Sequence, residues 1–349
     1  MGHSRTLATA LTLWILCLPA VGQEASSPAE SARPVLVIHG GAGTLRPGQM
    51  SEEDEQAYRE AMAAALYTGW EILSGGGSAL DAVEATVRSM EDSPLFNAGR
   101  GAVLNSDGRP QHDASIMDGE TQDAGAVGAV SRIKNPISAA RAVMERTPHV
   151  LLVGPDADLW AAQQGLETVE GAYFYTERRL RWLQERMAEG AGDHGTVGAV
   201  ALDRQGRLAA ATSTGGLSGK LPGRVGDSPI PGAGNWADPR CAVSGTGTGE
   251  YFIRYNVARD VCFRFEHQGG SLGDAAREVT NAAGEVEIVA GEGADAGVIA
   301  VADDGSWTFA FNTPGMLRGQ IDGDGVAQTW LYTEEDPAAV VPPASETSD

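Results

Sequence analysis

The stretch His194-Gly195-Thr196-Val197-Gly198-Ala199-Val200-Ala201-Leu202-Asp203 places a threonine at the first position of an apolar run, directly after the polar, glycine-rich residues 189–195. If the chain is cut before Thr196, this threonine gains a free α-amine beside its own hydroxyl. An α-amine titrates near ~8, so part of it is an unprotonated base at neutral pH. One residue would then supply both the nucleophile and the general base of an acyl-transfer reaction. The alternative is a threonine that merely opens a β-strand, and the flanking sequence has to decide between the two.

The residues after Thr196 predict a β-hairpin. Two small or apolar runs, 196–203 and 208–216, are joined by the polar residues 204–207, which include a glycine. A second hairpin is predicted for residues 297–302 and 307–311. Hairpins with small or apolar residues on both faces indicate sheets that are covered on both sides. An α+β fold with two central antiparallel sheets between helical layers fits this pattern, but periodicity alone does not distinguish it from other α/β arrangements.

Other elements follow from apolar spacing and from start and stop residues. Ser78 is expected to cap a helix, with Asp81 as its capping partner. Residues 176–187 are rich in arginine and glutamate and suit a surface connector or a tail freed by cleavage. The tail 333–349 is acidic and contains prolines, so we expect disorder there. Helices are also predicted over 52–73, 136–144, 250–265 and 272–283, and strands over 35–38 (ending in a glycine turn at 39–43), 125–130 and 150–153.

Several further motifs lie in a fixed order on both sides of Thr196. They are Ile38-His39-Gly40-Gly41-Ala42-Gly43, Pro94-Leu95-Phe96-Asn97-Ala98-Gly99, Met117-Asp118-Gly119, Thr147-Pro148-His149-Val150, Lys220-Leu221-Pro222-Gly223-Arg224-Val225-Gly226-Asp227-Ser228-Pro229, Ser244-Gly245-Thr246-Gly247-Thr248-Gly249-Glu250 and Phe311-Asn312-Thr313-Pro314-Gly315-Met316. In this order they resemble the plant-type asparaginase/isoaspartyl peptidase family of N-terminal-nucleophile hydrolases. The resemblance covers nearly everything between the leader and the acidic tail, and an ordered set of motifs is far more specific than any one of them.

The resemblance implies a four-layer αββα sandwich and a precursor that cleaves itself between Gly195 and Thr196. The expected products are an α-chain of about 23–195 and a β-chain of 196–349, which form one hydrolase domain and pair as a dimer of αβ units. The implied enzyme is a threonine amidohydrolase, an isoaspartyl peptidase/L-asparaginase. It would hydrolyse L-asparagine and β-aspartyl dipeptides and release L-aspartate through a threonine acyl-enzyme.

The resemblance also assigns roles to individual residues. Thr196 is the nucleophile, Thr246 and Gly247 supply oxyanion donors, and Thr214 and Asn97 orient the nucleophile. Arg224 can grip an α-carboxylate bidentately, and Asp227 can receive an α-ammonium. The substrate-binding set is completed by Thr246, Gly247 and a backbone contact at Gly249.

No cofactor for catalysis is implied, although the family holds a structural sodium ion on main-chain carbonyls. The matching residues here are Met90, Glu91, Ser93, Phe96, Ala98 and Arg100, with Arg100 standing where relatives have an apolar residue. The histidines at 39, 112, 149 and 194 show no metal-ligand spacing, and we expect each to be structural.

The leader and the overall composition indicate where the protein is located and which partners it can bind. Residues 1–22 have a basic start, an apolar stretch too short for a comfortable membrane span and a small-residue exit, which together indicate a signal peptide. An uncleaved anchor is the alternative. The formal net charge of −22 repels phosphate backbones and anionic membrane surfaces, so neither nucleic acid nor membrane is an expected partner. The chain has no Asn-X-Ser/Thr glycosylation site, and we expect an exported bacterial protein, periplasmic or secreted.

Removal of this leader leaves two cysteines, Cys241 and Cys262. Two thiols in an oxidising compartment can pair. Cys241 is expected to start a strand and Cys262 to lie late on the following helix, across a layer spacing of ~10 Å that is generous for a disulfide. The sequence leaves the pairing open.

Two rival functions remain. A glycosylasparaginase, acting on GlcNAc-Asn, shares the motif from Gly223 to Pro229 and its continuation Ile230–Gly234. That group usually has aspartate where Gly195 stands. The other rival is a non-catalytic relative that only binds amino acids.

Overall fold

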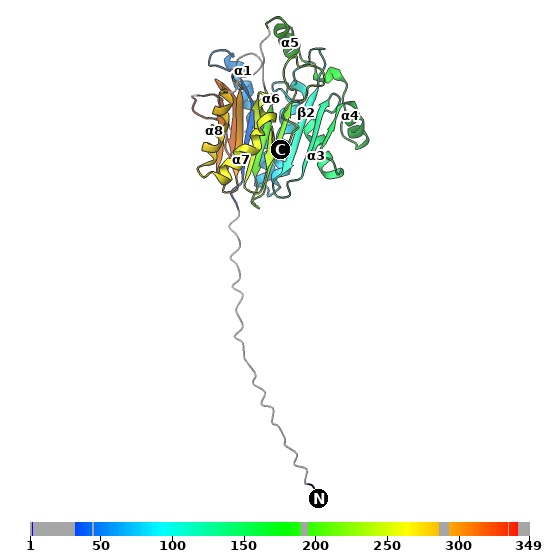
Figure 1. Cartoon of the computed structure of the whole chain (residues 1–349). Helices are drawn as coiled ribbons and strands as arrows, with labels where there is room; N and C mark the ends of the chain where they lie inside the picture. The colour runs from blue at the N-terminus through cyan, green and yellow to red at the C-terminus, as the bar shows by residue number, and fades with distance from the viewer. Residues whose placement is uncertain are drawn as a thin grey trace, which may run out of the picture. The chain divides into compact units, whose positions relative to one another are not determined.

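The described chain forms a layered α+β structure of strands and helices (Figure 1). Thr196, the nucleophile predicted from sequence, directly precedes strand β5, Val197–Leu202. The computed structural model describes residues 2, 32–43, 45–189, 195–285, 293–333 and 335–340. The predicted leader, apart from Gly2, and residues 190–194 before the predicted cut lie outside these ranges. All the elements given below belong to one unit, Ser31–Asp349.

Within the described residues the strands form two sheets. The larger has the order β13-β12-β11-β1-β5-β6-β2-β3-β4, and the smaller has the order β10-β9-β8-β7. Every pair of these strands is antiparallel except β3 with β4, at one end of the larger sheet. The strands are β1 Val35–Gly43, β2 His112–Asp118, β3 Ala124–Val130, β4 Leu151–Val153, β5 Val197–Leu202, β6 Leu208–Thr214, β7 Asn235–Ala237, β8 Cys241–Gly247, β9 Ala296–Ala302, β10 Trp307–Phe311, β11 Gly315–Ile321, β12 Ala327–Tyr332 and β13 Ala338–Val340.

Helices cover the outer face of each sheet. Helices α1, α2 and α3 pack on the larger sheet, and α7 and α8 pack on the smaller one. This is the four-layer αββα sandwich that the resemblance implied. The helices are α1 Glu52–Ser74, α2 Ala79–Asp92, α3 Pro136–Arg146, α4 Gly154–Gln163, α5 Glu177–Glu189, α6 Gly249–Tyr255, α7 Val257–His267 and α8 Leu272–Gly284, with short 3-10 turns at Gly99–Gly101 and Gly171–Phe174.

The alternation of side chains along β1 shows how the layers form. Leu36 and Ile38 point into the core shared with α1 and α2, whereas Val35 and Val37 point into the core between the two sheets. Because successive residues of a strand face opposite sides, a strand buried on both faces needs apolar residues throughout. A third core lies between the smaller sheet and α7 and α8.

Several local predictions are confirmed. The Ser78 side chain accepts a hydrogen bond from the backbone N–H of Asp81 at the start of α2. Both predicted hairpins are present as β5–β6 and β9–β10.

Two other local predictions are wrong. The first strand does not end at Ile38: β1 continues through the glycines to Gly43, because β11 pairs with it past a bulge between His39 and Gly41. The helix predicted over 250–265 is broken at Asn256, whose left-handed φ of 51° separates α6 from α7.

Residues 335–340 of the tail are held against the fold, against the prediction of disorder from 333. The Glu335 carboxylate accepts from the backbone N–H groups of Leu331 and Tyr332 at 2.7 and 2.9 Å and pairs with Arg59 of α1. Strand β13 then pairs with β12. These hydrogen bonds and the ion pair hold the segment in place even though it has few apolar side chains to bury. Residues 341–349 lie outside the described ranges.

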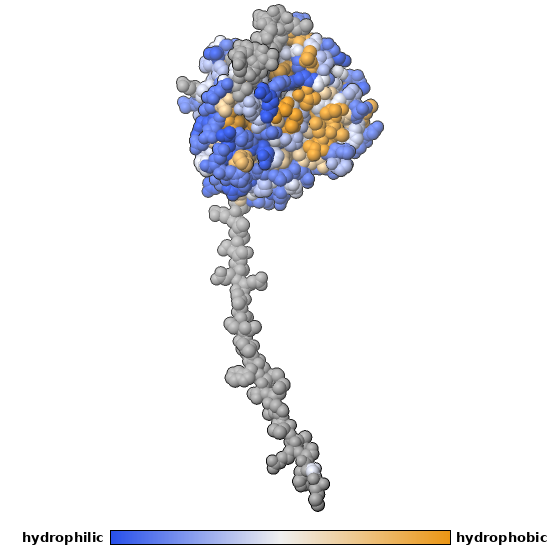
Figure 2. Space-filling model, in the orientation of Figure 1, coloured by the Kyte–Doolittle hydropathy of each residue, from blue (hydrophilic) through white to orange (hydrophobic). Residues whose placement is uncertain are grey.

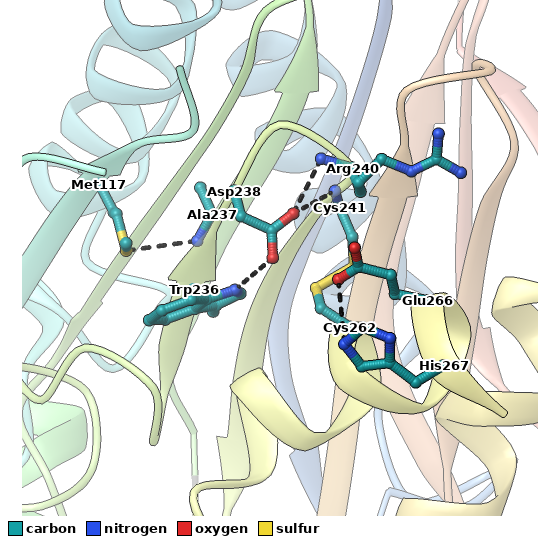
Figure 3. Close-up of a disulfide and its surroundings, with 9 residues drawn as sticks. All are labelled: Met117, Trp236, Ala237, Asp238, Arg240, Cys241, Cys262, Glu266 and His267. Carbon is teal, nitrogen blue, oxygen red and sulfur yellow. Dashed lines mark hydrogen bonds and ion pairs between the residues drawn. A yellow bond between two sulfur atoms is a disulfide. The ribbon is translucent and has the colours of Figure 1, made fainter. Parts of the chain in front are cut away.

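The two cysteines form a disulfide between the first residue of β8 and the middle of α7 (Figure 3). Their Cα atoms are 5.6 Å apart, which suits the bond. The layer spacing of ~10 Å is measured from the sheet to the helix axis, and it overestimates the distance between the two Cα atoms. A Cα atom on the side of the helix that faces the sheet lies about 2.3 Å closer than the axis. The question that the sequence left open is therefore settled in favour of pairing.

Candidate active site

Thr196 is buried at the start of β5, with only 7% of its surface exposed. Its carbonyl lies 2.9 Å from Nδ1 of His39 in β1, and Nε2 of His39 lies 2.9 Å from Oγ of Ser244 in β8. Burial lowers the pKa of His39 to about 3, against the opposing effect of its bond to Thr196, so the ring is neutral. Because a carbonyl can only accept, Nδ1 carries the proton and Nε2 accepts from Ser244. His39 thus links the nucleophile's backbone to both sheets.

The carbonyl oxygen of Gly195, on the bond predicted to break, is held by two donors. Nδ2 of Asn97 donates to it at 2.7 Å, and Oγ1 of Thr214 donates to it at 3.0 Å. The hydroxyl of Thr196 in turn donates to Oγ1 of Thr214 at 3.2 Å. Three of the predicted catalytic residues, from a loop and two strands, therefore meet at one peptide group.

Close packing at this peptide requires glycine at Gly41 and favours it at Gly195. A Cβ on Gly41 would lie 2.8 Å from Cα of Gly195, and Gly41 has a φ of +117°. A Cβ on Gly195 would lie 3.2 Å from Cβ of Asn97. The bulge in β1 therefore brings main chain against main chain at the predicted cut, as expected for a glycine chosen for close approach.

Thr246 and Gly247 end β8 on the other sheet. Oγ1 of Thr246 accepts a hydrogen bond from the backbone N–H of Ala42 at 3.3 Å, which leaves its own proton available to a ligand. Gly247 has a φ of +140°, and a Cβ there would lie 2.2 Å from the carbonyl oxygen of Asp295. Since Ala42 follows Gly41, strand β1 bridges the Gly195–Thr196 peptide and the predicted oxyanion donors.

Arg224, Asp227 and Gly249 come together as predicted. A Cβ on Gly249 would lie 2.7 Å from Oδ1 of Asp227 and 2.8 Å from Nη2 of Arg224, so both charged heads contact this glycine. Asp227 is buried, and Oδ2 has no hydrogen-bond partner among the described residues. Burial raises the pKa of Asp227 to about 7, and the Arg224 guanidinium opposes that shift. An unsatisfied buried carboxylate oxygen is suited to a cationic ligand group.

Sequence reasoning missed two charged residues at this site. Glu250 pairs with Arg224 through both carboxylate oxygens, at 3.0 Å each. Lys220 is buried, donates to the carbonyl of Gln111 at 2.9 Å and lies 3.9 Å from Asp113. Both residues stand inside the quoted motifs, and Glu250 directly follows the assigned Gly249; this is the one signal that could have pointed to them.

The predicted sodium loop closes around two glycines. A Cβ on Gly99 would lie 2.4 Å from the carbonyl oxygen of Glu91, and one on Gly101 would lie 2.2 Å from that of Phe96. Two of the six predicted carbonyls therefore lie against these glycines. The guanidinium of Arg100 lies over the ring of Tyr173, 5.7 Å from the ring centroid. The charged end of this side chain is therefore engaged by Tyr173, and only its main-chain carbonyl belongs to the predicted sodium ligands.

Other candidate features lie away from the predicted residues. Cavities of about 350 and 320 Å³ lie beside α3 and beside the disulfide, and neither is lined by a predicted catalytic or substrate-binding residue. Within the described ranges no three His, Cys, Asp or Glu side chains are grouped to hold a metal ion. The same residues include no helix with the length and apolarity to cross a membrane. His194 lies outside the described residues.

Comparison with known proteins identifies the family. A family model described as asparaginase matches residues 32–331, which is most of the chain. The chain belongs to the asparaginase family. It is 44% identical to an isoaspartyl peptidase of Escherichia coli over 317 residues, covering 87% of this chain and 97% of that protein.

Other relatives of this asparaginase-family chain carry similar names. The isoaspartyl peptidase of Salmonella typhimurium is 45% identical over 316 residues, covering 86% of this chain and 99% of the relative. The isoaspartyl peptidase/L-asparaginase of Bos taurus is 44% identical over 292 residues, covering 81% and 91%. The expected N-terminal-nucleophile hydrolase fold and enzyme class are thereby confirmed.

Proposed function

We propose that this asparaginase-family chain is a self-processing hydrolase of L-asparagine and β-aspartyl dipeptides that releases L-aspartate. The observation that carries the proposal is the Gly195 carbonyl, which accepts from Asn97 and Thr214 while the Thr196 hydroxyl lies in the same network. The names of the relatives, isoaspartyl peptidase and isoaspartyl peptidase/L-asparaginase, support this substrate class.

Self-cleavage begins with attack of the Thr196 hydroxyl oxygen on the carbonyl carbon of Gly195. The hydroxyl proton is removed in this step and returned to the peptide nitrogen in the next, and the two donors, Asn97 and Thr214, stabilise the negative charge on the carbonyl oxygen. The C–N bond then breaks, the nitrogen takes up a proton, and an ester joins Gly195 to Oγ1 of Thr196. Water hydrolyses this ester, which frees the carboxylate of Gly195 and both the hydroxyl and the α-amine of Thr196.

The two products, about 23–195 and 196–349, are expected to remain together. In the larger sheet β5 lies between β1 and β6, and β6 pairs with β2. Strands from both sides of the cut therefore alternate, and separating the products would break sheet hydrogen bonds and expose three cores.

Turnover uses the freed threonine as nucleophile and its α-amine as general base. Oγ1 of Thr196 attacks the side-chain amide carbonyl of the substrate, and ammonia or an amino acid leaves with a proton from the α-ammonium. The Thr246 hydroxyl and the Gly247 N–H stabilise the oxyanion, each donor typically contributing ~3–4 kcal/mol. Water then releases L-aspartate from the acyl-enzyme.

Substrate choice rests on the charges that surround Gly249. Arg224 binds the α-carboxylate, while the carboxylate of Asp227, whose Oδ1 faces Gly249, accepts from the α-ammonium. L-asparagine and β-aspartyl dipeptides offer the same zwitterionic head group. An enzyme with a net charge of −22 can accept such a group because the group is neutral overall.

A structural sodium ion on the carbonyls of Met90, Glu91, Ser93, Phe96, Ala98 and Arg100 is part of the proposal. It would supply only charge to fix the loop, and no catalytic step needs it. The resemblance of this segment to the family's sodium loop supports it. Asn97 stands in the same loop, so the expected benefit is a fixed position for its amide.

We further propose that residues 1–22 are removed on export and that the mature αβ units form dimers. A disulfide within the chain fits an oxidising compartment such as the periplasm. Support for a dimer comes from exposed apolar residues at the β4 edge, on the side where Figure 2 shows apolar areas. Val150, Leu151, Val153 and Leu159 are 40–60% exposed there. Sedimentation of Val153→Asp as a single αβ unit, and of the wild type as a pair, would support that interface.

Denaturing gels and activity assays test the main proposal. The wild type should run as two fragments and release ammonia from L-asparagine, whereas Thr196→Ala should stay full length and inactive. Arg224→Ala should mature normally but bind substrate poorly. Comparison of L-asparagine, β-Asp-Leu and GlcNAc-Asn separates this function from a glycosylasparaginase. Activity from an uncut wild-type chain would refute the proposal.

A further inference from the structure

The planar guanidinium of Arg224 has two edges that can each bind a carboxylate through two N–H groups. One of these edges is occupied by the side chain of another residue of the chain. Nε and Nη2 of Arg224 donate to Oε1 and Oε2 of Glu250, at 3.0 Å each. Glu250 is the second residue of α6. Its side chain is 48% exposed, whereas that of Arg224 is 16% exposed. The pair therefore has a solvent side, at Glu250, and a protein side, at the other edge of the guanidinium.

Glycines surround the second edge, formed by Nη1 and Nη2. A Cβ on Gly226 would lie 2.8 Å from Nη1, and one on Gly216 would lie 3.3 Å from the same atom. A Cβ on Gly249 would lie 2.8 Å from Nη2. Because these three residues have no side chain, none of them blocks the second edge to a planar bidentate partner.

This open edge lies next to the other groups of the site. Gly249 also contacts Oδ1 of Asp227, and the N–H of Gly216 donates to Oγ1 of Thr214 at 2.9 Å. A carboxylate on the Nη1–Nη2 edge would thus lie between the ammonium acceptor and the turn that supports Thr214. A carboxylate on the Nε–Nη2 edge would lie on the side of the exposed Glu250.

We propose that Glu250 is a positioning residue that holds Arg224 with its Nη1–Nη2 edge presented to the α-carboxylate of the substrate. The inference rests on the proposed function for the identity of that carboxylate. A free arginine side chain loses rotamer freedom when it binds, and a fixed guanidinium has already lost it. Glu250 therefore increases affinity for the head group without touching the substrate or the reacting atoms.

The opposite role for Glu250 predicts the opposite result. If its carboxylate occupied the substrate's own place on Arg224, removing it would strengthen substrate binding. Geometry favours positioning, because one guanidinium can bind two carboxylates on different edges. The sign of the change in KM separates the two roles.

The experiment crosses a change in the enzyme with a change in the substrate. Mature Glu250→Gln and Glu250→Ala are compared with the wild type on L-asparagine and on L-aspartic acid diamide, which lacks the α-carboxylate. For L-asparagine we expect KM to rise about tenfold with kcat within about twofold, as for loss of a charged hydrogen-bond partner. For the diamide we expect kcat/KM to change by less than about twofold, because no α-carboxylate depends on the orientation of Arg224.

Two controls belong to this experiment. Glu278→Gln removes another exposed glutamate that pairs with an arginine, Arg264 at 3.2 Å, and should leave both substrates unaffected. Glu250→Asp keeps the charge on a shorter side chain and should restore part of the affinity. Calorimetric binding of L-aspartate gives a readout that needs no turnover, and its Kd should also weaken about tenfold in Glu250→Gln.

Each other outcome has a definite meaning. An unchanged or lower KM for L-asparagine in Glu250→Ala would overturn the positioning role. An equal loss on both substrates would overturn it too, since that pattern indicates general damage to the site. A wild type that binds L-aspartate but releases no ammonia would refute the proposed function, while the L-aspartate measurement would still decide the role of Glu250.

Discussion

The side-chain amide of Asn97 donates to the carbonyl oxygen of Gly195 at 2.7 Å, although 98 residues separate them in the chain. The same amide donates to the carbonyl of Gly216 at 2.8 Å, and its oxygen accepts from the N–H of Val103 at 2.8 Å. All its hydrogen-bonding groups are thus used to aim one donor at the peptide that is proposed to break. This arrangement has a direct kinetic consequence.

Asn97→Ala should slow self-cleavage by about 10²–10³-fold, the usual effect of removing one oxyanion donor. Conversion of the purified precursor to its two fragments, followed over time on denaturing gels, measures the rate. Asn281→Ala, at an exposed asparagine of α8, is the matched control and should mature at the wild-type rate. Normal maturation of Asn97→Ala would exclude Asn97 from the cleavage step.

The raised pKa of Asp227 predicts a pH dependence of catalysis. Burial raises this pKa to about 7, and only the ionised carboxylate attracts an α-ammonium. For L-asparagine, kcat/KM should therefore fall as pH drops below about 7, because kcat/KM reports groups of the free enzyme. The bound ammonium keeps Asp227 ionised, so this step should be absent from kcat, whereas the α-amine of Thr196 titrates in both.

Rate profiles over roughly pH 5–9 with two substrates check this assignment. Succinamate lacks the α-ammonium, so its kcat/KM should not show the step assigned to Asp227. If succinamate and L-asparagine show the same acid limb, the titrating group is not Asp227.

Local sequence patterns were sufficient for part of the fold. The hairpin β5–β6 and the Ser78 cap depend on neighbours in sequence, and both were predicted. The extension of β1 through Gly43 could not be predicted, because glycine is depleted in strands. The pairing of Gly41, Ala42 and Gly43 with β11 holds this extension in place, and that pairing depends on residues far along the chain. The break at Asn256 likewise depends on a backbone conformation that periodicity does not reveal.

The candidate site also contains residues that the sequence could identify and contacts that it could not. Asn97, Thr214 and Thr246 have ordinary residue types, and only the order of the surrounding motifs pointed to them. The bond from His39 to Thr196 and the pairing of Glu250 with Arg224 arise between elements distant in sequence. No spacing rule links such residues, so they became visible only when the sheets were assembled.

Loss of the disulfide should destabilise the protein without stopping maturation. The bond closes a loop with a sequence separation of 21, and cross-linking a loop of that size contributes about 3 kcal/mol. Cys241→Ala combined with Cys262→Ala should lower the free energy of unfolding in urea by about this amount. Wild type unfolded in the presence of a reductant should match the double variant. Equal stability with and without reductant would show that the bond contributes nothing.

Gly198→Ala should disrupt the junction of the two sheets. A Cβ at Gly198 would lie 2.0 Å from Oγ of Ser244 and 2.4 Å from Nε2 of His39, so the methyl group would force apart the hydrogen bond between those side chains. We expect a loss of about 1–3 kcal/mol of stability from overpacking, and slower self-cleavage because His39 also holds the carbonyl of Thr196. Gly128→Ala in β3 is the matched control, since a Cβ there meets only the side chains of Val153 and Val225 at 3.3 Å or more. Thermal unfolding and gel-based maturation assays measure the two effects. If Gly198→Ala matures and melts like Gly128→Ala, the contact of β1, β5 and β8 at His39 does not position the nucleophile.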